Sequence, residues 1–350
     1  MDCDMERFQP FWESSDIKEE ILVFVEENDV ISATLAFDNP QNVVLRDRTG
    51  RIFEKDKDYM QRGNQVIAIN KDIPYLKAEW LRNENVPREL PNENETYNIE
   101  GCLLIDPLYL KNMQIFADYS TDKKCDLEVV SNDIRLPETK RLLNEEKKLK
   151  IALFGDSISN AANSSFEMGF SGFTHWITPA IEYIQGESGA TVEFVNVSRS
   201  GYGTEWALEA VEEKLGKEHV DLTVIAFGMN DGSADMSVET FVQNVSKLID
   251  DIRNYNPNTE FVLVATPIPN ADCKSVYKEQ VHYIDGLRAL EGEGIAVVNM
   301  TEVFIWLLKR KRYCEISGNN LNHPNDFGYR FYTDAFKLLF YKILNKDGTK

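Results

Sequence analysis

The strongest constraint on the fold is an alternation of apolar runs and amphipathic stretches in the second part of the chain. Buried parallel strands are nearly continuous apolar runs, because helices cover both of their faces. Such runs occupy residues 150–154, 192–197, 222–227, 261–266 and 295–300. The stretches between them are long enough for crossover helices. The pattern therefore predicts an α/β fold with a doubly wound, parallel, five-stranded sheet.

One intervening helix can be predicted in detail. Between the third and fourth runs, apolar residues recur at helical spacing on one face: Val238, Phe241, Val245, Leu248, Ile249 and Ile252. Ser237 is a candidate N-cap, and Asn256 followed by Pro257 predicts the end of this helix. A helix of this kind fits a crossover that packs one face on the sheet.

The N-terminal part has a different pattern. Its apolar runs are short, rich in β-branched residues and separated by turn sequences, and they lie at residues 21–26, 42–47, 65–70 and 127–132. They predict a β-sandwich or jelly-roll domain at residues 1–136. The charged segment 137–149 predicts a linking helix, which leaves residues 150–350 for the α/β domain. A length of 350 residues suits two domains of about 150 residues each.

The charge of the chain excludes some partners. Acidic residues outnumber basic ones by 58 to 38, which gives a formal net charge of −20. A surface this acidic repels phosphate backbones and anionic lipid headgroups, so we expect no nucleic acid and no membrane partner. The N-terminus has no signal-peptide pattern, and no apolar window reaches the length of about 18 residues that a membrane span needs. We therefore expect a cytoplasmic protein.

The cysteines carry little functional information. They are five and scattered, without the spacing of a disulfide framework or a zinc site: Cys3, Cys102, Cys125, Cys273 and Cys314. Buried free thiols are the expected outcome, with no metal and no other cofactor. The sequence leaves the oligomeric state open.

Four polar or glycine-containing blocks lie where a doubly wound sheet places its ligand site, beyond the carboxyl ends of the strands. Ser157 stands in GDSIS after the first run, Gly201 in SGYG after the second, and Asn230 in GMND after the third. His323 stands in NHPND, just before the C-terminal helix. Each block alone also has a structural explanation, such as a helix cap, a positive φ or an Asx turn.

Together, these four blocks resemble the SGNH hydrolases, a subgroup of the GDSL esterases and lipases, whose letters match Ser157, Gly201, Asn230 and His323. The resemblance covers about residues 150 to 340 and implies a flavodoxin-like sheet. With its β-rich N-terminal module, the chain also resembles two-domain bacterial proteins related to carbohydrate esterase family two. Those proteins join a jelly-roll domain to the hydrolase.

The resemblance implies a role for each matched residue. Ser157 would be the nucleophile, and His323 would accept its proton and later donate a proton to the leaving alcohol, so that an acyl-enzyme forms. The backbone N–H groups of Ser157 and Gly201, with the side-chain amide of Asn230, would form the oxyanion hole. Asp156 would brace the turn that carries the nucleophile.

The sequence departs from the family pattern at Asn320. Most members have an aspartate three residues before the histidine, where it orients the imidazole. In serine proteases, replacing that carboxylate with an amide costs a factor on the order of 10⁴, because the wrong tautomer is held. A backbone carbonyl, as in carbohydrate esterase family two, or Asp326 must take over this role. We favour the carbonyl and thus a Ser–His dyad, because Asp326 in a first helical turn already has a stabilising structural role.

The leading functional hypothesis is a serine esterase that removes a short acyl group, with acetyl favoured, from a carbohydrate. Trp176, Tyr202 and Trp206 are candidates for a wall against a sugar ring, or for core residues. One alternative is a catalytically silent carbohydrate-binding protein, in which Asn320 marks decay of the triad. Another is a soluble acyl thioesterase or lipase-like hydrolase, although the charge of −20 disfavours membrane lipid.

Overall fold

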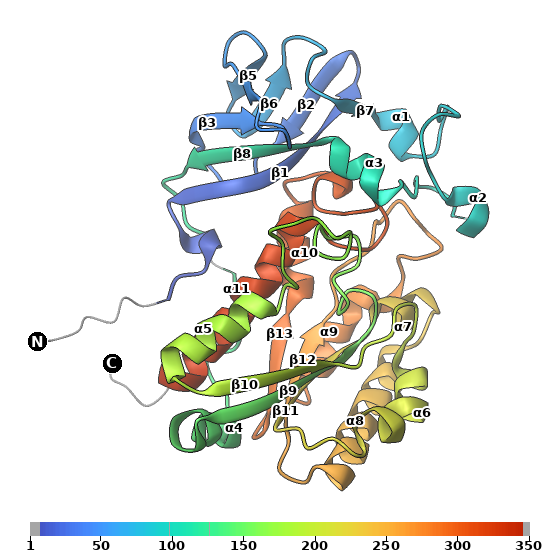
Figure 1. Cartoon of the computed structure of the whole chain (residues 1–350). Coiled ribbons are helices and arrows are strands. Elements are labelled where there is room, and N and C mark those ends of the chain that lie inside the picture. The colour runs from blue at the N-terminus through green and yellow to red at the C-terminus, as the bar shows by residue number, and fades with distance from the viewer. Residues whose placement is uncertain (1–7, 98, 126, 346–350) are drawn as a thin grey trace, which may run out of the picture.

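A computed structural model describes residues 8–97, 99–125 and 127–345. A β-rich N-terminal domain lies against an α/β unit, and helix α11 Asp326–Asn345 begins beside the β-rich domain and runs away from it (Figure 1). The strands of the N-terminal domain are β1 Asp16–Glu27, β2 Val30–Thr34, β3 Gln41–Arg46, β4 Ile52–Phe53, β5 Tyr59–Arg62, β6 Gln65–Ala68, β7 Tyr75–Lys77 and β8 Gln114–Ser120. Their order is β4-β3-β8-β1-β2-β6-β5, with β7 paired to β1. Apart from the parallel β1–β7 pair, these strands are antiparallel.

Strand β1 is the centre of this domain. Its N-terminal half pairs with β8, and its last residues pair with β2 and β7. The run 21–25 is wholly buried because both of its faces are covered. Phe24 packs into the large core that continues into the α/β unit, whereas Val23 and Val25 pack into a smaller cluster with Leu103 and Leu110. The domain is completed by short helical segments: η1 Phe11–Glu13, α1 Ala78–Leu81, α2 Asn94–Tyr97 and α3 Pro107–Asn112.

The predicted β-rich class of this domain is confirmed, at the level of an antiparallel β-rich fold rather than of a jelly roll. Runs 21–26, 42–47 and 65–70 overlap β1, β3 and β6. The strand predicted at 127–132 is wrong. That segment has only an isolated bridge from Val130 to Val298, and Val129 accepts a hydrogen bond from Asn299. Its apolar side chains are buried against the edge of the other sheet instead of within a sheet of their own.

The segment between the two parts is helical. Helix α4 Pro137–Arg141 continues into the π-helical turn η2 Leu142–Glu146. The carboxylate of Glu260 accepts hydrogen bonds from the backbone N–H groups of Glu138 at 3.0 Å and Thr139 at 2.7 Å. The linker is thereby held on the first residue of strand β12. The division into residues 1–136, 137–149 and 150–350 stays a prediction.

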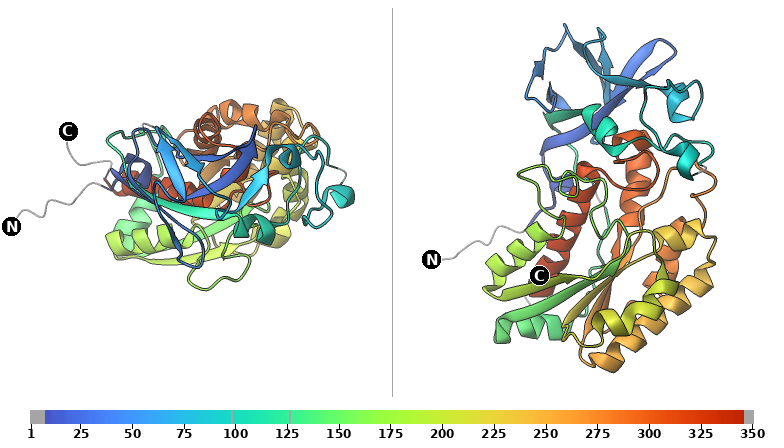
Figure 2. Two further views of the ribbon diagram at one scale, coloured as in Figure 1. Left: turned by 90° about the horizontal axis from the view of Figure 1, so that it is seen from above. Right: turned by 45° about the vertical axis from the view of Figure 1, so that its right-hand side comes forward.

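The predicted five-stranded parallel sheet is confirmed. Its strands are β9 Lys148–Gly155, β10 Thr191–Asn196, β11 Leu222–Ala226, β12 Glu260–Ala265 and β13 Ile295–Asn299, in the order β10-β9-β11-β12-β13. Helices cover both faces (Figure 2). Ile151 and Leu153 face the layer of α5 Thr178–Ser188, α10 Met300–Leu308 and α11 Asp326–Asn345. Ala152 and Phe154 face the layer of α6 Thr204–Leu215, α8 Val238–Tyr255 and α9 Tyr283–Arg288.

Helix α8 begins and ends as predicted. The Ser237 side chain accepts a hydrogen bond from Thr240 N at 3.2 Å, and Asn256 is the C-cap. The buried face consists of Phe241, Val245, Leu248, Ile249 and Ile252. The remaining short helices are α7 Met229–Ser233, η3 Glu279–His282 and η4 Tyr313–Glu315.

The cysteine expectation can be checked at four positions, since Cys3 lies outside the described residues. Cys102, Cys125, Cys273 and Cys314 are all buried, and no disulfide is found in the described ranges. No helix among the described residues is long and apolar enough to span a membrane.

The two parts of the chain share buried contacts. Trp12 stacks on Phe331 of α11 with ring centroids 5.4 Å apart. The Nζ atom of Lys311, from the α/β part, lies 2.5 Å from Glu20 of β1, and both side chains are 0% exposed. A buried charge is costly unless it is paired, so this ion pair fixes one docking geometry.

Breaking the Lys311–Glu20 pair tests this role. Lys311→Met should lower the free energy of unfolding by about 3–5 kcal/mol, because the Glu20 carboxylate would stay buried without its cation. The measurement is urea unfolding followed by circular dichroism. Lys57→Met, at the exposed Lys57–Glu54 pair, is the control and should have no measurable effect. Equal effects of the two substitutions would contradict a structural role for the buried pair.

Candidate functional site

Two of the predicted site residues are in direct contact. Ser157 follows strand β9, and its Oγ atom lies 2.8 Å from Nε2 of His323, which precedes helix α11. Ser157 is 6% exposed, whereas His323 is half-buried. A hydroxyl at hydrogen-bond distance from an imidazole nitrogen is the geometry that proton transfer between them requires.

The turn that carries Ser157 depends on close packing between two strand ends. A Cβ atom on Gly155 would lie 2.4 Å from the carbonyl oxygen of Ala226, so only glycine lets β9 and β11 approach here. The next residue, Asp156, is buried and accepts a hydrogen bond from Ile158 N at 2.9 Å. Burial raises the pKa of Asp156 to about 7, although backbone hydrogen bonds from Ile158 and Met229 act in the opposite direction. These contacts suit a residue that braces the turn.

Three hydrogen-bond donors predicted for an oxyanion hole follow strands at the carboxyl edge of the sheet: Ser157 and Gly201 lie on turns, and Asn230 lies in the short helix α7. In the described part of the chain, the backbone N–H groups of Ser157 and Gly201 have no acceptor. Gly201 has a φ of +82°, with open space where a Cβ would stand. The Asn230 side-chain amide donates one hydrogen to the carbonyl of Tyr202 at 3.0 Å. Its second amide hydrogen is left for another acceptor.

Asp231 of helix α7 holds the segments that carry Gly201 and Asn230 together. One of its carboxylate oxygens accepts hydrogen bonds from the Thr204 N–H at 2.7 Å and from the Thr204 hydroxyl at 2.5 Å. The other oxygen accepts from Gly228 N at 3.0 Å. Both segments are therefore fixed to one carboxylate. Sequence reasoning missed this role, and its only sequence signal is the last letter of the GMND block.

The second ring nitrogen of His323 faces a side-chain amide. Its Nδ1 atom lies 2.6 Å from Oδ1 of Asn163 and 3.2 Å from Nδ2 of Asn319. If Nε2 is to accept the proton of Ser157, Nδ1 carries the ring hydrogen and donates it to Asn163 Oδ1. Asn319 then acts on the loop backbone, since its Oδ1 accepts from the N–H groups of three following residues: Leu321, Asn322 and His323.

This arrangement corrects our expectation of how His323 is oriented. In the described part of the chain, neither a backbone carbonyl nor Asp326 bonds to Nδ1. Asn320 is buried with a φ of +62°, and its side chain points away to donate to Leu103 O at 3.0 Å. Asp326 accepts hydrogen bonds from Ser165 and Lys111 instead.

Asn163 was not predicted from the sequence. It lies on the loop after Ser157, in the left-handed region with a φ of +63°, and Ala161 has a φ of +58°. Asparagine tolerates this conformation better than most residues, which is the one local signal that the sequence carries. The loop is held in part by Tyr329, whose hydroxyl donates to Ala162 O at 3.0 Å.

The surroundings of His323 favour its neutral form. Burial lowers the pKa of His323 to about 4. The imidazole is therefore unprotonated at neutral pH, as a general base must be.

The three aromatic candidates lie in different surroundings. Trp176 is a buried core residue whose indole N–H donates to Ile158 O at 3.2 Å. Tyr202 is 37% exposed and packs on the partly buried Trp206 with ring centroids 5.3 Å apart. The guanidinium of Arg199 lies 4.0 Å from the Tyr202 ring centroid. Of the three aromatic candidates, Tyr202 is the one that directly follows Gly201 in the chain.

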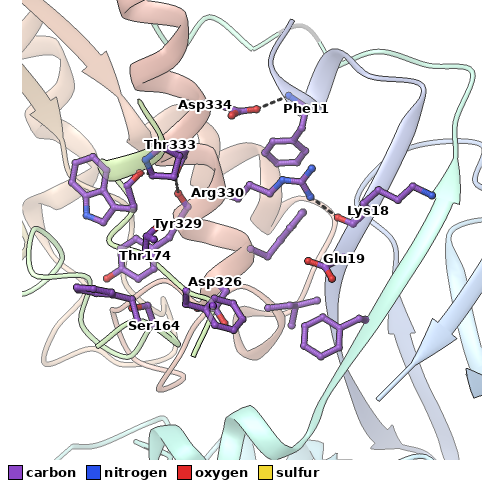
Figure 3. Close-up of a pocket in the computed structure, with 18 of the residues that line it drawn as sticks. Phe11, Lys18, Glu19, Ser164, Thr174, Asp326, Tyr329, Arg330, Thr333 and Asp334 are labelled. Carbon is purple, nitrogen blue, oxygen red and sulfur yellow. Dashed lines mark hydrogen bonds between the residues drawn. The ribbon is translucent and has the colours of Figure 1, made fainter. Parts of the chain in front are cut away.

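A cavity of about 910 Å³ lies between the β-rich domain and helix α11. Figure 3 shows its charged lining, where Arg330 reaches from α11 to the carbonyl of Lys18, near Glu19. Ser157 and His323 are not among its lining residues, although Ser164 and Asp326 are. The cavity therefore adjoins the loop that carries Asn163 without including the Ser157–His323 pair.

Comparison with solved structures finds similarity to two esterases. A two-domain esterase (CEX) active on acetylated mannans has a TM-score of 0.51 and 19% identity, over 64% of this chain and 58% of its own. The present chain thus matches less than two thirds of that esterase's length. The acetylxylan esterase Axe2 from Geobacillus stearothermophilus has a TM-score of 0.45 and 16% identity, over 55% of this chain and 94% of its own.

No curated protein matches the chain. Residues 153–331 match the GDSL-like Lipase/Acylhydrolase family. This segment is more than half of the chain, and it includes Ser157, Gly201, Asn230 and His323. The protein therefore belongs to the GDSL-like Lipase/Acylhydrolase family.

Proposed function

We propose that this protein is a serine esterase that hydrolyses short acyl esters through an acyl-enzyme. The observation that carries the proposal is the 2.8 Å contact between Ser157 Oγ and His323 Nε2. The membership in an acylhydrolase family supports it. So do the N–H groups of Ser157 and Gly201, which have no acceptor among the described residues.

In the proposed reaction, His323 takes the hydroxyl proton as Ser157 Oγ attacks the ester carbonyl. The oxygen that becomes negative is stabilised by the N–H groups of Ser157 and Gly201 and by the free amide hydrogen of Asn230. When the tetrahedral intermediate collapses, His323 gives the proton to the leaving alcohol. Water, activated by the same histidine, then releases the acid from Ser157.

In this mechanism, Asn163 orients the imidazole in place of the family's aspartate. An amide oxygen accepts the Nδ1 hydrogen and so selects the tautomer that a base needs. It carries no charge, so it stabilises the imidazolium less than a carboxylate would. The oxyanion donors would then supply a larger share of the stabilisation.

For the substrate, we propose an acetyl group on a carbohydrate. The fold similarity to a two-domain esterase active on acetylated mannans, also crystallised with mannopentaose, supports this choice. The charge of −20 favours a neutral substrate over a polyanionic one. Tyr202, which is 37% exposed beside Gly201, offers an aromatic edge for contact with a sugar.

Substitution of the nucleophile tests the reaction. Ser157→Ala should lower the rate of p-nitrophenyl acetate hydrolysis by a factor on the order of 10⁴ or more, because no oxygen is left to form the acyl-enzyme. A fluorophosphonate should label the wild type and not the variant. Equal rates in the two proteins, or a wild type that is not labelled, would favour the catalytically silent carbohydrate-binding alternative. Faster turnover of a soluble acyl thioester than of acetylated oligosaccharides would favour the thioesterase alternative.

Two substitutions of Asn163 test its proposed role. Asn163→Gly tolerates the left-handed backbone but removes the acceptor, so kcat should fall by about 10² or more. Asn163→Asp keeps an acceptor oxygen at the same place and should stay within about tenfold of the wild type. Steady-state kinetics on p-nitrophenyl acetate give both values. If the two variants lose activity equally, the contact with His323 Nδ1 is not what matters.

The pH dependence of kcat/KM tests the role of His323 as the base. Protonation removes the base, so activity should be lost as the pH falls through the pKa of His323. Burial lowers this pKa to about 4, and the acidic limb should therefore lie below 6.5, the ordinary histidine value. Circular dichroism over the same range separates this limb from acid unfolding. A limb near 7 would instead implicate Asp156, whose pKa burial raises to about 7.

A further inference from the structure

A buried lysine of the β-rich domain reaches into the support of the proposed catalytic pair. Lys111 is near the end of helix α3 and is 2% exposed. Its Nζ atom donates to Ser165 Oγ at 2.8 Å and to Asp326 Oδ2 at 3.0 Å. Burial lowers the pKa of Lys111, and the Asp326 carboxylate opposes that change. Lysine is almost never this buried without a specific partner.

Ser165, Asp326 and Lys111 form a closed network. The Ser165 N–H donates to Asp326 Oδ1 at 2.6 Å, and the Ser165 hydroxyl donates to Asp326 Oδ2 at 2.7 Å. Ser165 is two residues after Asn163, and Asp326 is three residues after His323. The network therefore joins the two segments whose separation sets the 2.6 Å contact between Asn163 and His323.

The loop that carries Asn163 needs external support. Ala161 has a φ of +58°, a conformation that an alanine keeps only where its surroundings hold it. The β-rich domain supplies further contacts to this loop through Phe170. The guanidinium of Arg48 lies 4.7 Å from the Phe170 ring centroid, and Nζ of Lys111 lies 5.7 Å from it. Both cations come from the β-rich domain.

We propose that Lys111 is a positioning residue for catalysis: through Ser165 and Asp326 it fixes the loop on which Asn163 orients His323. The inference rests on the proposed esterase function. If Lys111 has this role, the β-rich domain helps to position the reacting groups, in addition to packing on the catalytic part. Lys111 itself touches neither Ser157 nor His323.

The simplest competing explanation is that Lys111 only holds the two domains together. The chain offers a matched control, because Lys311 is also a fully buried lysine that pairs across the interface, with Glu20. In the described structure, neither Lys311 nor Glu20 bonds to the loop of Asn163 or to Asp326. Loss of either lysine should weaken docking, but only loss of Lys111 should disturb His323.

The first measurement compares Lys111→Met and Lys311→Met in the full chain at a temperature where circular dichroism shows both to be folded. Lys111→Met should lower kcat on p-nitrophenyl acetate on the order of tenfold, with KM within about twofold, because the reacting groups are misplaced while the pocket remains. Lys311→Met should leave kcat within about twofold. Equal losses of kcat in the two variants would overturn the proposal.

The second measurement is a double-mutant cycle between Lys111→Met and Asn163→Gly. If Lys111 acts through Asn163, the double variant should be no slower than Asn163→Gly alone. If the two losses multiply, Lys111 acts by another route and the proposal fails. A merely structural lysine would give this multiplicative result.

Two further controls keep the outcomes separate. If Lys111→Met does not fold, Lys111→Met with Asp326→Asn replaces it, since neutralising both partners is tolerated better than removing one. The same cycle with Asn163→Gly then applies. Failure of the esterase function itself would be seen in the wild type, as activity that Ser157→Ala does not abolish. If only the positioning proposal is wrong, the wild type still has activity that depends on Ser157, and the losses of kcat in the double-mutant cycle multiply.

Discussion

The structure depends on two ion pairs, each with a buried lysine, that cross the interface between its two parts in opposite directions. Lys311 of the α/β part reaches Glu20 of β1, and Lys111 of the β-rich part reaches Asp326 at the start of α11. An apolar interface tolerates small shifts, but a buried charge that loses its partner is strongly destabilising. The two pairs therefore select one docking geometry. The loop of Asn163 is bonded to one of these pairs, because Ser165 contacts both Lys111 and Asp326.

The sequence predicted those features that local patterns encode. Continuous apolar runs identified all five strands of the parallel sheet, and the capping residues of α8 defined its ends. Ser157 could be found because strand ends in a parallel sheet converge at one edge, and His323 because the four blocks together resemble a known family. The false strand at 127–132 has the same composition as a true one, but its backbone pairs at the edge of another sheet. Asn163 was missed because its role depends on a contact with a residue 160 positions away.

Asn163 also bears on the pKa of His323, because it places an uncharged group beside the imidazole. A carboxylate beside His323 would raise the pKa of the imidazole by favouring its charged form. With an amide oxygen in that place, burial dominates and the pKa falls to about 4. His323 is then neutral over the whole physiological range. In the proposed reaction, a histidine with this pKa is a weaker base than one beside a carboxylate, so the reaction would rely more on the proposed oxyanion donors.

The residue at the family's aspartate position explains why the site is built in this way. Asn320 has a φ of +62°, and its side-chain amide donates to the carbonyl of Leu103 in the β-rich domain. An aspartate there would turn a carboxylate oxygen toward that carbonyl, where two acceptors repel and a buried charge has no cation. The contact between the domains thus requires a donor at this position. In the proposed mechanism, orientation of His323 comes from another segment, the loop of Asn163, and Lys111, Ser165 and Asp326 join that loop to the start of α11.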